Sequence, residues 1–151
     1  MKLLLMRHGD AEPGHLDRHR PLSAYGRDQI TRQALAHQQE ANNVQQLACS
    51  PYTRAAQTAV LFAQLTNINN IAIDWLDDLT PQGSPRAIEG FLQQTQADNL
   101  VMVSHLPLVG LLIDYLTGET GTSMGTASLA SLSMDYPAQG MATLNWIHYV
   151  D

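Results

Sequence analysis

The amino-acid sequence predicts an α/β fold of three layers (α/β/α), in which helices cover both faces of a mainly parallel sheet that ends in an antiparallel C-terminal edge. Two patterns indicate this fold class. Short apolar runs alternate with helix-length segments up to about residue 117. Two stretches of alternating apolar and polar residues then follow, 128–135 and 142–150, as expected of an antiparallel pair at a sheet edge. At 151 residues the chain has the length of one domain, so a single domain is expected over 1–151.

The parallel strands are expected from four short apolar runs, at 3–6, 44–49, 71–75 and 100–104. The last run is apolar almost throughout, which is typical of a strand covered on both faces. The first run stops abruptly at Arg7, His8 and Gly9. In open α/β sheets, ligands bind just beyond the carboxyl ends of the strands, so this junction is the first candidate for a functional site.

The helices between these strands are expected at about 24–40, at 53–65, from Pro85 onward and at 108–116. Ser23 and Ser84 stand where an N-cap is needed, and Gly118 stands where the last helix should end. Leu35 and Val60 belong to apolar patterns of helical spacing, so we expect both to face the sheet.

Composition and charge narrow the class of function. Hydrophobic residues make up 44% and charged residues 15%, as in a globular protein. The net charge is −6, from 14 acidic and 8 basic residues, which argues against a nucleic-acid or acidic-membrane partner. The longest apolar run, 106–113, is far shorter than the ~20 residues that span a bilayer. We therefore expect a cytoplasmic protein.

Charged or titratable side chains follow the end of every expected parallel strand. They are Arg7 and His8, then Arg54, then Asp77 and Asp78, then His105. Because the carboxyl ends of parallel strands share one edge of the sheet, we expect these groups to lie close together. Guanidinium groups match phosphate oxygens, and an imidazole can act as a nucleophile or as a charged donor. The sequence therefore predicts a phosphoryl-binding pocket at this edge.

Several motifs in this order resemble a known family. They are Met6-Arg7-His8-Gly9-Asp10-Ala11, Arg20-Pro21-Leu22, Ser50-Pro51 with Arg54, Leu79-Thr80-Pro81 and Ser104-His105-Leu106-Pro107-Leu108-Val109-Gly110. The ordered set is similar to the histidine phosphatase superfamily, also called the phosphoglycerate mutase-like family, and within it to the SixA-type phosphohistidine phosphatases. The similarity covers essentially the whole chain. It implies a phosphoglycerate mutase-like fold.

The resemblance also implies roles for the strand-end residues. His8 would be the nucleophile, with its second ring nitrogen bonded to a backbone carbonyl. Arg7, Arg54 and a protonated His105 would surround the phosphoryl oxygens. For Asp78 two interpretations stay open, the acid that protonates the leaving group and a simple loop carboxylate.

The implied activity is that of a phosphohistidine phosphatase with a covalent phosphohistidine intermediate, acting in signal transduction. The expected substrate is a phosphohistidine-bearing protein, such as a histidine phosphotransfer domain of a phosphorelay or a phosphocarrier. Arg18 and Arg20 are candidates to meet acidic groups on that partner, although Arg20 is equally consistent with a phosphate contact or a solvated loop charge. A monomer without metal or other cofactor is expected.

Two alternative functions stay open at this stage. One is a phosphatase of small phosphorylated metabolites, or a mutase, and the other is a non-catalytic module that binds phosphoproteins. The segment 76–83 and the tail offer little material for a lid, which favours an open site and a protein substrate. Cys49 and Arg54 have four residues between them, whereas the cysteine phosphatases place five between nucleophile and arginine, so Cys49 is expected to be a small buried residue.

Overall fold

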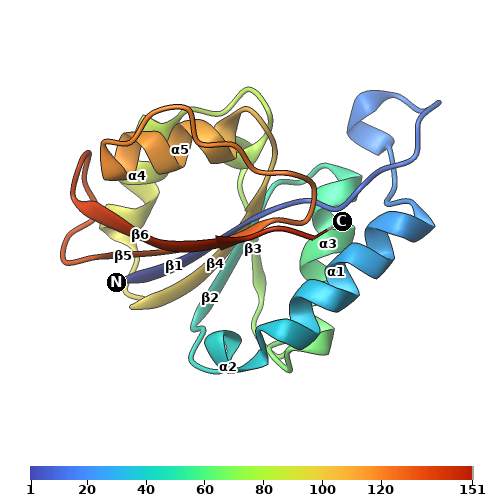
Figure 1. The fold of residues 1–151 in the computed structure, drawn as a ribbon, viewed down its shortest axis with the longest axis horizontal. Helices are drawn as coiled ribbons and strands as arrows, with labels where there is room; N and C mark the ends of the chain where they lie inside the picture. Colours follow the sequence, from blue (N-terminus) through green and yellow to red (C-terminus); the bar gives the residue numbers. More distant parts are fainter. Residues whose placement is uncertain (151) are drawn as a thin grey trace.

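The structure is a computed structural model that describes residues 1–150, and it contains one six-stranded sheet between two layers of helices (Figure 1). The strands are β1 Lys2–Arg7, β2 Gln46–Cys49, β3 Ile73–Trp75, β4 Asn99–Ser104, β5 Leu129–Met134 and β6 Ala142–His148. The helices are α1 Ala24–Ala36, α2 Gln38–Ala41, α3 Thr53–Leu65, α4 Pro85–Gln94 and α5 Leu108–Thr117, with 3₁₀ turns η1 Asp17–His19 and η2 Asp77–Leu79.

The sheet has the order β3-β2-β4-β1-β5-β6. Its first four strands in this order run parallel, whereas β5 pairs antiparallel with β1 and β6 antiparallel with β5. The predicted fold class and the antiparallel C-terminal pair are therefore confirmed. Because β1 lies beside β4, the residues that follow these two strands are brought next to each other.

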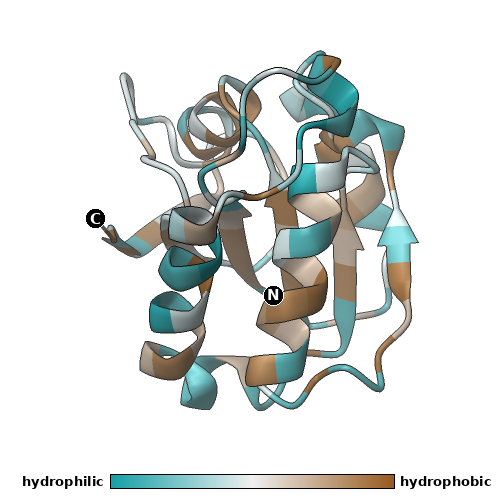
Figure 2. Cartoon of the chain, turned by 90° about the vertical axis from the view of Figure 1, so that its right-hand side faces the viewer, coloured by the Kyte–Doolittle hydropathy of each residue, from teal (hydrophilic) through white to brown (hydrophobic). Residues whose placement is uncertain are grey.

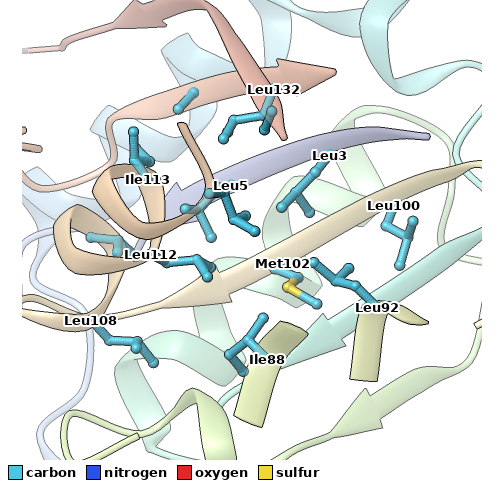
Figure 3. Close-up of a cluster of buried hydrophobic side chains, with 14 of the residues drawn as sticks. Leu3, Leu5, Ile88, Leu92, Leu100, Met102, Leu108, Leu112, Ile113 and Leu132 are labelled. Carbon is cyan, nitrogen blue, oxygen red and sulfur yellow. The ribbon is translucent and has the colours of Figure 1, made fainter. Parts of the chain in front are cut away.

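The two faces of the sheet are covered by different helices. In Figure 1, α1, α2 and α3 lie on one face, and α4 and α5 lie on the other. Alternate residues of β1 enter two separate cores, since Leu3 and Leu5 pack with α4 and α5 while Leu4 and Met6 pack with α1 and α3. This explains why the strand is apolar at every position between Lys2 and Arg7. Figure 3 shows the first core, with Leu3 and Leu5 beside side chains of β4, α4 and α5.

Polar residues mark the surface of this arrangement. Figure 2 shows strands that are largely apolar, whereas the helices carry both polar and apolar residues. No helix described in residues 1–150 is long and apolar enough to cross a membrane.

Two predicted details of the helices are wrong. The helix expected at about 24–40 is divided into α1 and α2 at His37. Leu35 and Val60 are 58% and 43% exposed, because the inward faces of α1 and α3 are formed instead by residues such as Ile30 and Phe62. The predicted caps are confirmed: Ser23 accepts from the amide of Gly26, Ser84 from that of Ala87, and Gly118 ends α5 at φ 83°.

The segment after β1 is closed at its base and fixed to α1. A β-bridge joins Ala11 to Leu22, and the amide of Ser23 donates to the carbonyl of Asp10 at 2.9 Å. Gly26 packs directly on the Asp10 backbone, so a Cβ at Gly26 would lie 2.1 Å from that carbonyl oxygen. The contact needs glycine because neither backbone can yield. We call residues 11–22 the closed loop.

Gly26→Ala should destabilise the protein by at least about 2 kcal/mol, since the new methyl group would overlap backbone atoms. Gly90→Ala is the matched control, because Gly90 also lies inside a helix and a Cβ there meets nothing within 4 Å. That variant should gain about 0.5–1 kcal/mol from helix propensity. Urea unfolding of both variants measures the difference, and equal midpoints would contradict the close packing of α1 on Asp10.

Candidate active site

The ends of β1 and β4 and the start of α3 bring Arg7, His8, Arg54 and His105 together, as the sequence predicted. The amide of His8 donates to the carbonyl of Ser104 at 3.0 Å, which places His8 beside His105. The centroids of the two imidazole rings are 5.1 Å apart. Arg54, in the first turn of α3, contacts His8 directly. His8, Arg54 and His105 are buried, and Arg7 is half-buried.

Two contacts determine which ring nitrogen of His8 carries a proton. Nδ1 lies 2.7 Å from the carbonyl oxygen of Gly9, which can only accept a hydrogen bond. Nε2 lies 3.2 Å from Nε of Arg54, which can only donate one. The neutral ring is therefore protonated on Nδ1 and has its lone pair on Nε2. The expected contact of His8 with a backbone carbonyl is present.

Thr58 links the backbone of Gly9 to the first turn of α3. Its hydroxyl accepts from the amide of Gly9 at 3.1 Å and donates to the carbonyl of Arg54, one turn earlier in α3, at 2.7 Å. The backbone that orients Nδ1 of His8 and the helical turn that carries Arg54 are therefore held by one buried side chain.

The charges around His8 keep it neutral. Burial is the main cause that lowers its pKa, to about 4, and the positive charges of Arg54, Arg7 and Arg20 lower it further, while the hydrogen bond to Gly9 opposes them. At pH 7 the lone pair on Nε2 is thus available, as a nucleophile requires.

His105 is also neutral in the protein by itself. Burial is again the main cause, followed by His8 and Arg54, and together they lower its pKa to about 3 although Asp17 opposes them. The expected protonation of His105 concerns a site with a phosphoryl group bound, and it stays a prediction. Nε2 of His105 lies 2.8 Å from the hydroxyl of Ser50, and its Nδ1 is buried without a partner among the described residues.

The two arginines differ in how they are held. Arg7 donates from Nη1 to the carbonyl of Met124 at 2.9 Å, and its buried Nε has no partner in the described part of the chain. Arg54 donates from Nη1 to the carbonyl of Asp17 at 2.6 Å, and its Nη2 lies 3.3 Å from the Asp17 carboxylate. Burial, and then the charge of Arg54, lower the pKa of Arg7.

Arg20 and Asp78 make no direct contact with the four clustered residues at the strand ends. Arg20 donates to the carbonyl of Glu12 at 2.9 Å and pairs with the Asp17 carboxylate at 3.3 Å, so it reaches Arg54 only through Asp17. Asp78 is exposed in η2, and within residues 1–150 its side chain shares no hydrogen bond or ion pair with the strand-end residues.

Sequence reasoning missed three side chains that complete the site: Asp17, Ser50 and Tyr52. The Tyr52 ring lies 5.0 Å from that of His105 and beneath the guanidinium groups of Arg54 and Arg18, at 5.3 and 5.7 Å. Ser50 had a signal, because it directly follows a strand. Asp17 had none, since it is one of several polar residues in the closed loop.

The chemistry open to this site is that of an oxyanion-binding pocket with a nucleophile. Arg54 contacts the nitrogen that carries the lone pair of His8, and the charge of Arg7 acts on the same ring. The buried nitrogens of Arg7 and His105 that have no partner among the described residues are available to bind further oxygens. Among the described residues, no group of three or more His, Cys, Asp or Glu side chains is arranged to hold a metal ion. Cys49 is buried, as expected, and burial raises the pKa of its thiol.

Comparisons with known proteins give a consistent result. Residues 3–80 match the model of the histidine phosphatase superfamily (branch 1). The chain is 32% identical to phosphohistidine phosphatase SixA of Escherichia coli (strain K12), over 97% of this chain and 92% of that protein. It is 29% identical to a SixA homolog of Haemophilus influenzae (strain ATCC 51907 / DSM 11121 / KW20 / Rd), over 89% of each. A solved structure of the protein histidine phosphatase SixA with tungstate superposes with a TM-score of 0.86 at 31% identity, over 99% of this chain and 97% of that one.

The depressed pKa values predict a loss of stability in acid. Both histidines stay neutral in the folded protein, with pKa values of about 4 and 3, but take protons near pH 6.5 once unfolded. Because the unfolded state then binds more protons, the free energy of unfolding should fall as pH drops below 6.5, by up to about 1.4 kcal/mol per pH unit for each histidine.

His105→Gln removes one of these contributions, so its unfolding free energy should depend less steeply on pH than that of the unsubstituted protein. Exposed His15 provides the control substitution, His15→Gln, which should leave the slope as it was. Urea titrations at a series of pH values between about 7 and 4.5 give the slopes. Identical slopes for all three proteins would show that His105 is not held neutral by the fold.

Proposed function

The chain belongs to the histidine phosphatase superfamily, and on that basis we propose that it removes phosphoryl groups from phosphohistidine residues of other proteins. The observation that carries this proposal is the orientation of His8. Its Nδ1 is held by the Gly9 carbonyl, and its Nε2 presents a lone pair beside Arg54. The similarity to SixA over nearly the full length of both chains supports the same activity.

In the first half-reaction, Nε2 of His8 attacks the phosphorus atom and the bond from phosphorus to the substrate's ring nitrogen breaks. The electron pair of that bond returns to the leaving imidazole. Arg54 exchanges its contact with Nε2 for contacts with the phosphoryl oxygens, and Nε of Arg7 supplies a further donor. Fixed donors of this kind stabilise the charge that the transferring phosphoryl group spreads over its oxygens.

His105 takes part as a neutral donor. If the Ser50 hydroxyl donates to Nε2, the proton of the neutral ring is on Nδ1, the nitrogen that is buried without a partner. A phosphoryl oxygen at Nδ1 would complete its hydrogen bonding. A bound dianion would also raise the pKa of His105, because it opposes the positive charges nearby. In the second half-reaction, water attacks phosphorus and releases His8.

Within residues 1–150, the side chain of Asp78 has no hydrogen bond or ion pair that supports a role as the acid. Phosphohistidine reduces the need for one, since an imidazole protonated on its other ring nitrogen leaves as a neutral molecule. Arg20 acts on the site through Asp17, and the position of Arg18 over the ring of Tyr52 supports a contact of this pair with a protein partner.

The substrate proposed is a histidine phosphotransfer domain or a phosphocarrier. The short segment around η2 and the use of the tail as β5 and β6 leave little chain to enclose a small ligand. We place the enzyme in the cytoplasm as a monomer, acting on neither nucleic acid nor membrane, and needing neither metal nor other cofactor.

Rapid-quench labelling tests the intermediate. With a ³²P-labelled phosphohistidine protein, the unsubstituted enzyme should acquire acid-labile, base-stable phosphate on His8 within one turnover, also in the presence of a chelator. His8→Ala should remove both the label and the turnover. If the protein binds the phosphoprotein but never becomes labelled, it is a binding module and not an enzyme. Strict dependence on added metal would favour metal-assisted hydrolysis instead.

Parallel assays test the substrate. The value of kcat/KM for a phosphohistidine-bearing protein should exceed that for 3-phosphoglycerate or a sugar phosphate by at least ~10², because an open site makes few remote contacts to a small ligand. A preference for either small metabolite would instead identify a metabolite phosphatase or mutase.

A further inference from the structure

Asp17 is a carboxylate that contacts Arg54 of the site directly. Its Oδ2 is 3.3 Å from Nη2 of Arg54, and Nε of that same guanidinium is 3.2 Å from Nε2 of His8. Two hydrogen-bond lengths and one guanidinium group therefore separate the carboxylate from the attacking nitrogen. A phosphoryl group joined to an imidazole ring has a comparable span.

The position of Asp17 is fixed by several contacts. Its backbone carbonyl accepts from Arg54 at 2.6 Å, and its Oδ1 pairs with Arg20 at 3.3 Å. Its neighbour Arg18 lies over the ring of Tyr52, which in turn touches His105. The negative charge of Asp17 is also felt by His105, whose pKa it raises against the other influences. The η1 turn thus holds this carboxylate at the mouth of the site.

Asp17 is unsuited to donate a proton. Although partial burial alone would raise its pKa, the charges and hydrogen bonds of Arg54 and Arg20 lower it overall. It is therefore ionised at neutral pH and can only accept hydrogen bonds. An ionised carboxylate has about four acceptor positions, of which the two arginines use two. The side chain is 59% exposed, so the carboxylate is accessible to an approaching substrate.

We propose that Asp17 binds the protonated imidazole of the substrate phosphohistidine, accepting a hydrogen bond from the ring nitrogen that does not carry phosphorus. This inference rests on the proposed function. Asp17 is then the residue that selects a nitrogen-linked phosphoryl group on an imidazole over an alkyl phosphate, which offers no such cation.

The interaction also favours the first half-reaction. A carboxylate beside the distal ring nitrogen keeps its proton in place. When Nε2 of His8 bonds to phosphorus, the electron pair of the breaking bond neutralises the imidazolium, and imidazole leaves with its distal N–H intact. No further acid is needed. For a phosphomonoester the same carboxylate is only a negative charge near an anion, so it opposes binding.

Asp17→Asn tests this assignment, because asparagine keeps the shape and an acceptor oxygen for Arg54 but loses the charge. With 1-phosphoimidazole, kcat/KM should fall about ten- to a hundredfold, the effect of one charged hydrogen bond. With glycerol 2-phosphate it should stay the same or rise. Asp17→Glu retains the charge and should keep the preference for phosphoimidazole. Asp28→Asn removes an exposed carboxylate from α1, outside the site, and serves as the matched control.

Single-turnover labelling measures phosphorylation and dephosphorylation of His8 separately. A purely structural role of Asp17 would not affect one step without the other. Asp17→Asn should slow phosphorylation of His8 by 1-phosphoimidazole but leave hydrolysis of phosphorylated His8 unchanged, since imidazole has left by then. Equal losses on both substrates and in both steps would show that Asp17 only positions Arg54, and would overturn the inference. If the unsubstituted enzyme hydrolyses glycerol 2-phosphate but neither phosphoimidazole nor a phosphohistidine protein, the proposed function itself fails.

Discussion

The contacts of the His8 ring are the constraint on which the rest of the site depends. A carbonyl that can only accept and a guanidinium that can only donate leave a single neutral tautomer. Both partners come from strand and helix ends, Gly9 directly after β1 and Arg54 in the first turn of α3, and Thr58 ties them together. The orientation of one imidazole is thus supported by the sheet and by a helix that packs on it. Rigid elements of this kind hold a nucleophile more precisely than a loop can.

The site concentrates positive charge in an otherwise acidic protein. The chain has a net charge of −6, yet four of its seven arginines lie at this edge of the sheet: Arg7, Arg18, Arg20 and Arg54. Burial of both histidines is the main influence that lowers their pKa values, and the charges of Arg54 and Arg7 add to it. A phosphoryl dianion would balance the positive charge of these arginines.

The four strand-end residues were predictable because topology alone brings them together. Strand periodicity locates the ends of β1, β2 and β4, and parallel neighbours share an edge. The charge state of His105 was not predictable, because it depends on burial and on arginines that are distant in sequence. Asp17 was missed because its role follows from the path of the closed loop, which no periodicity describes. Leu35 and Val60 were misplaced because an apolar residue at helical spacing can still lie at the margin of the buried face.

The closed loop has a consequence for how such enzymes diversify. Its ends meet at the bridge between Ala11 and Leu22, and the packing of Gly26 on Asp10 fixes its base to α1. Between these fixed ends, Asp17 contacts Arg54, which in turn contacts His8, so a change in the loop's interior also reaches the neighbour of the nucleophile. Divergence of this loop is therefore constrained twice, by the bridge that closes its ends and by the bonds that its interior makes to Arg54.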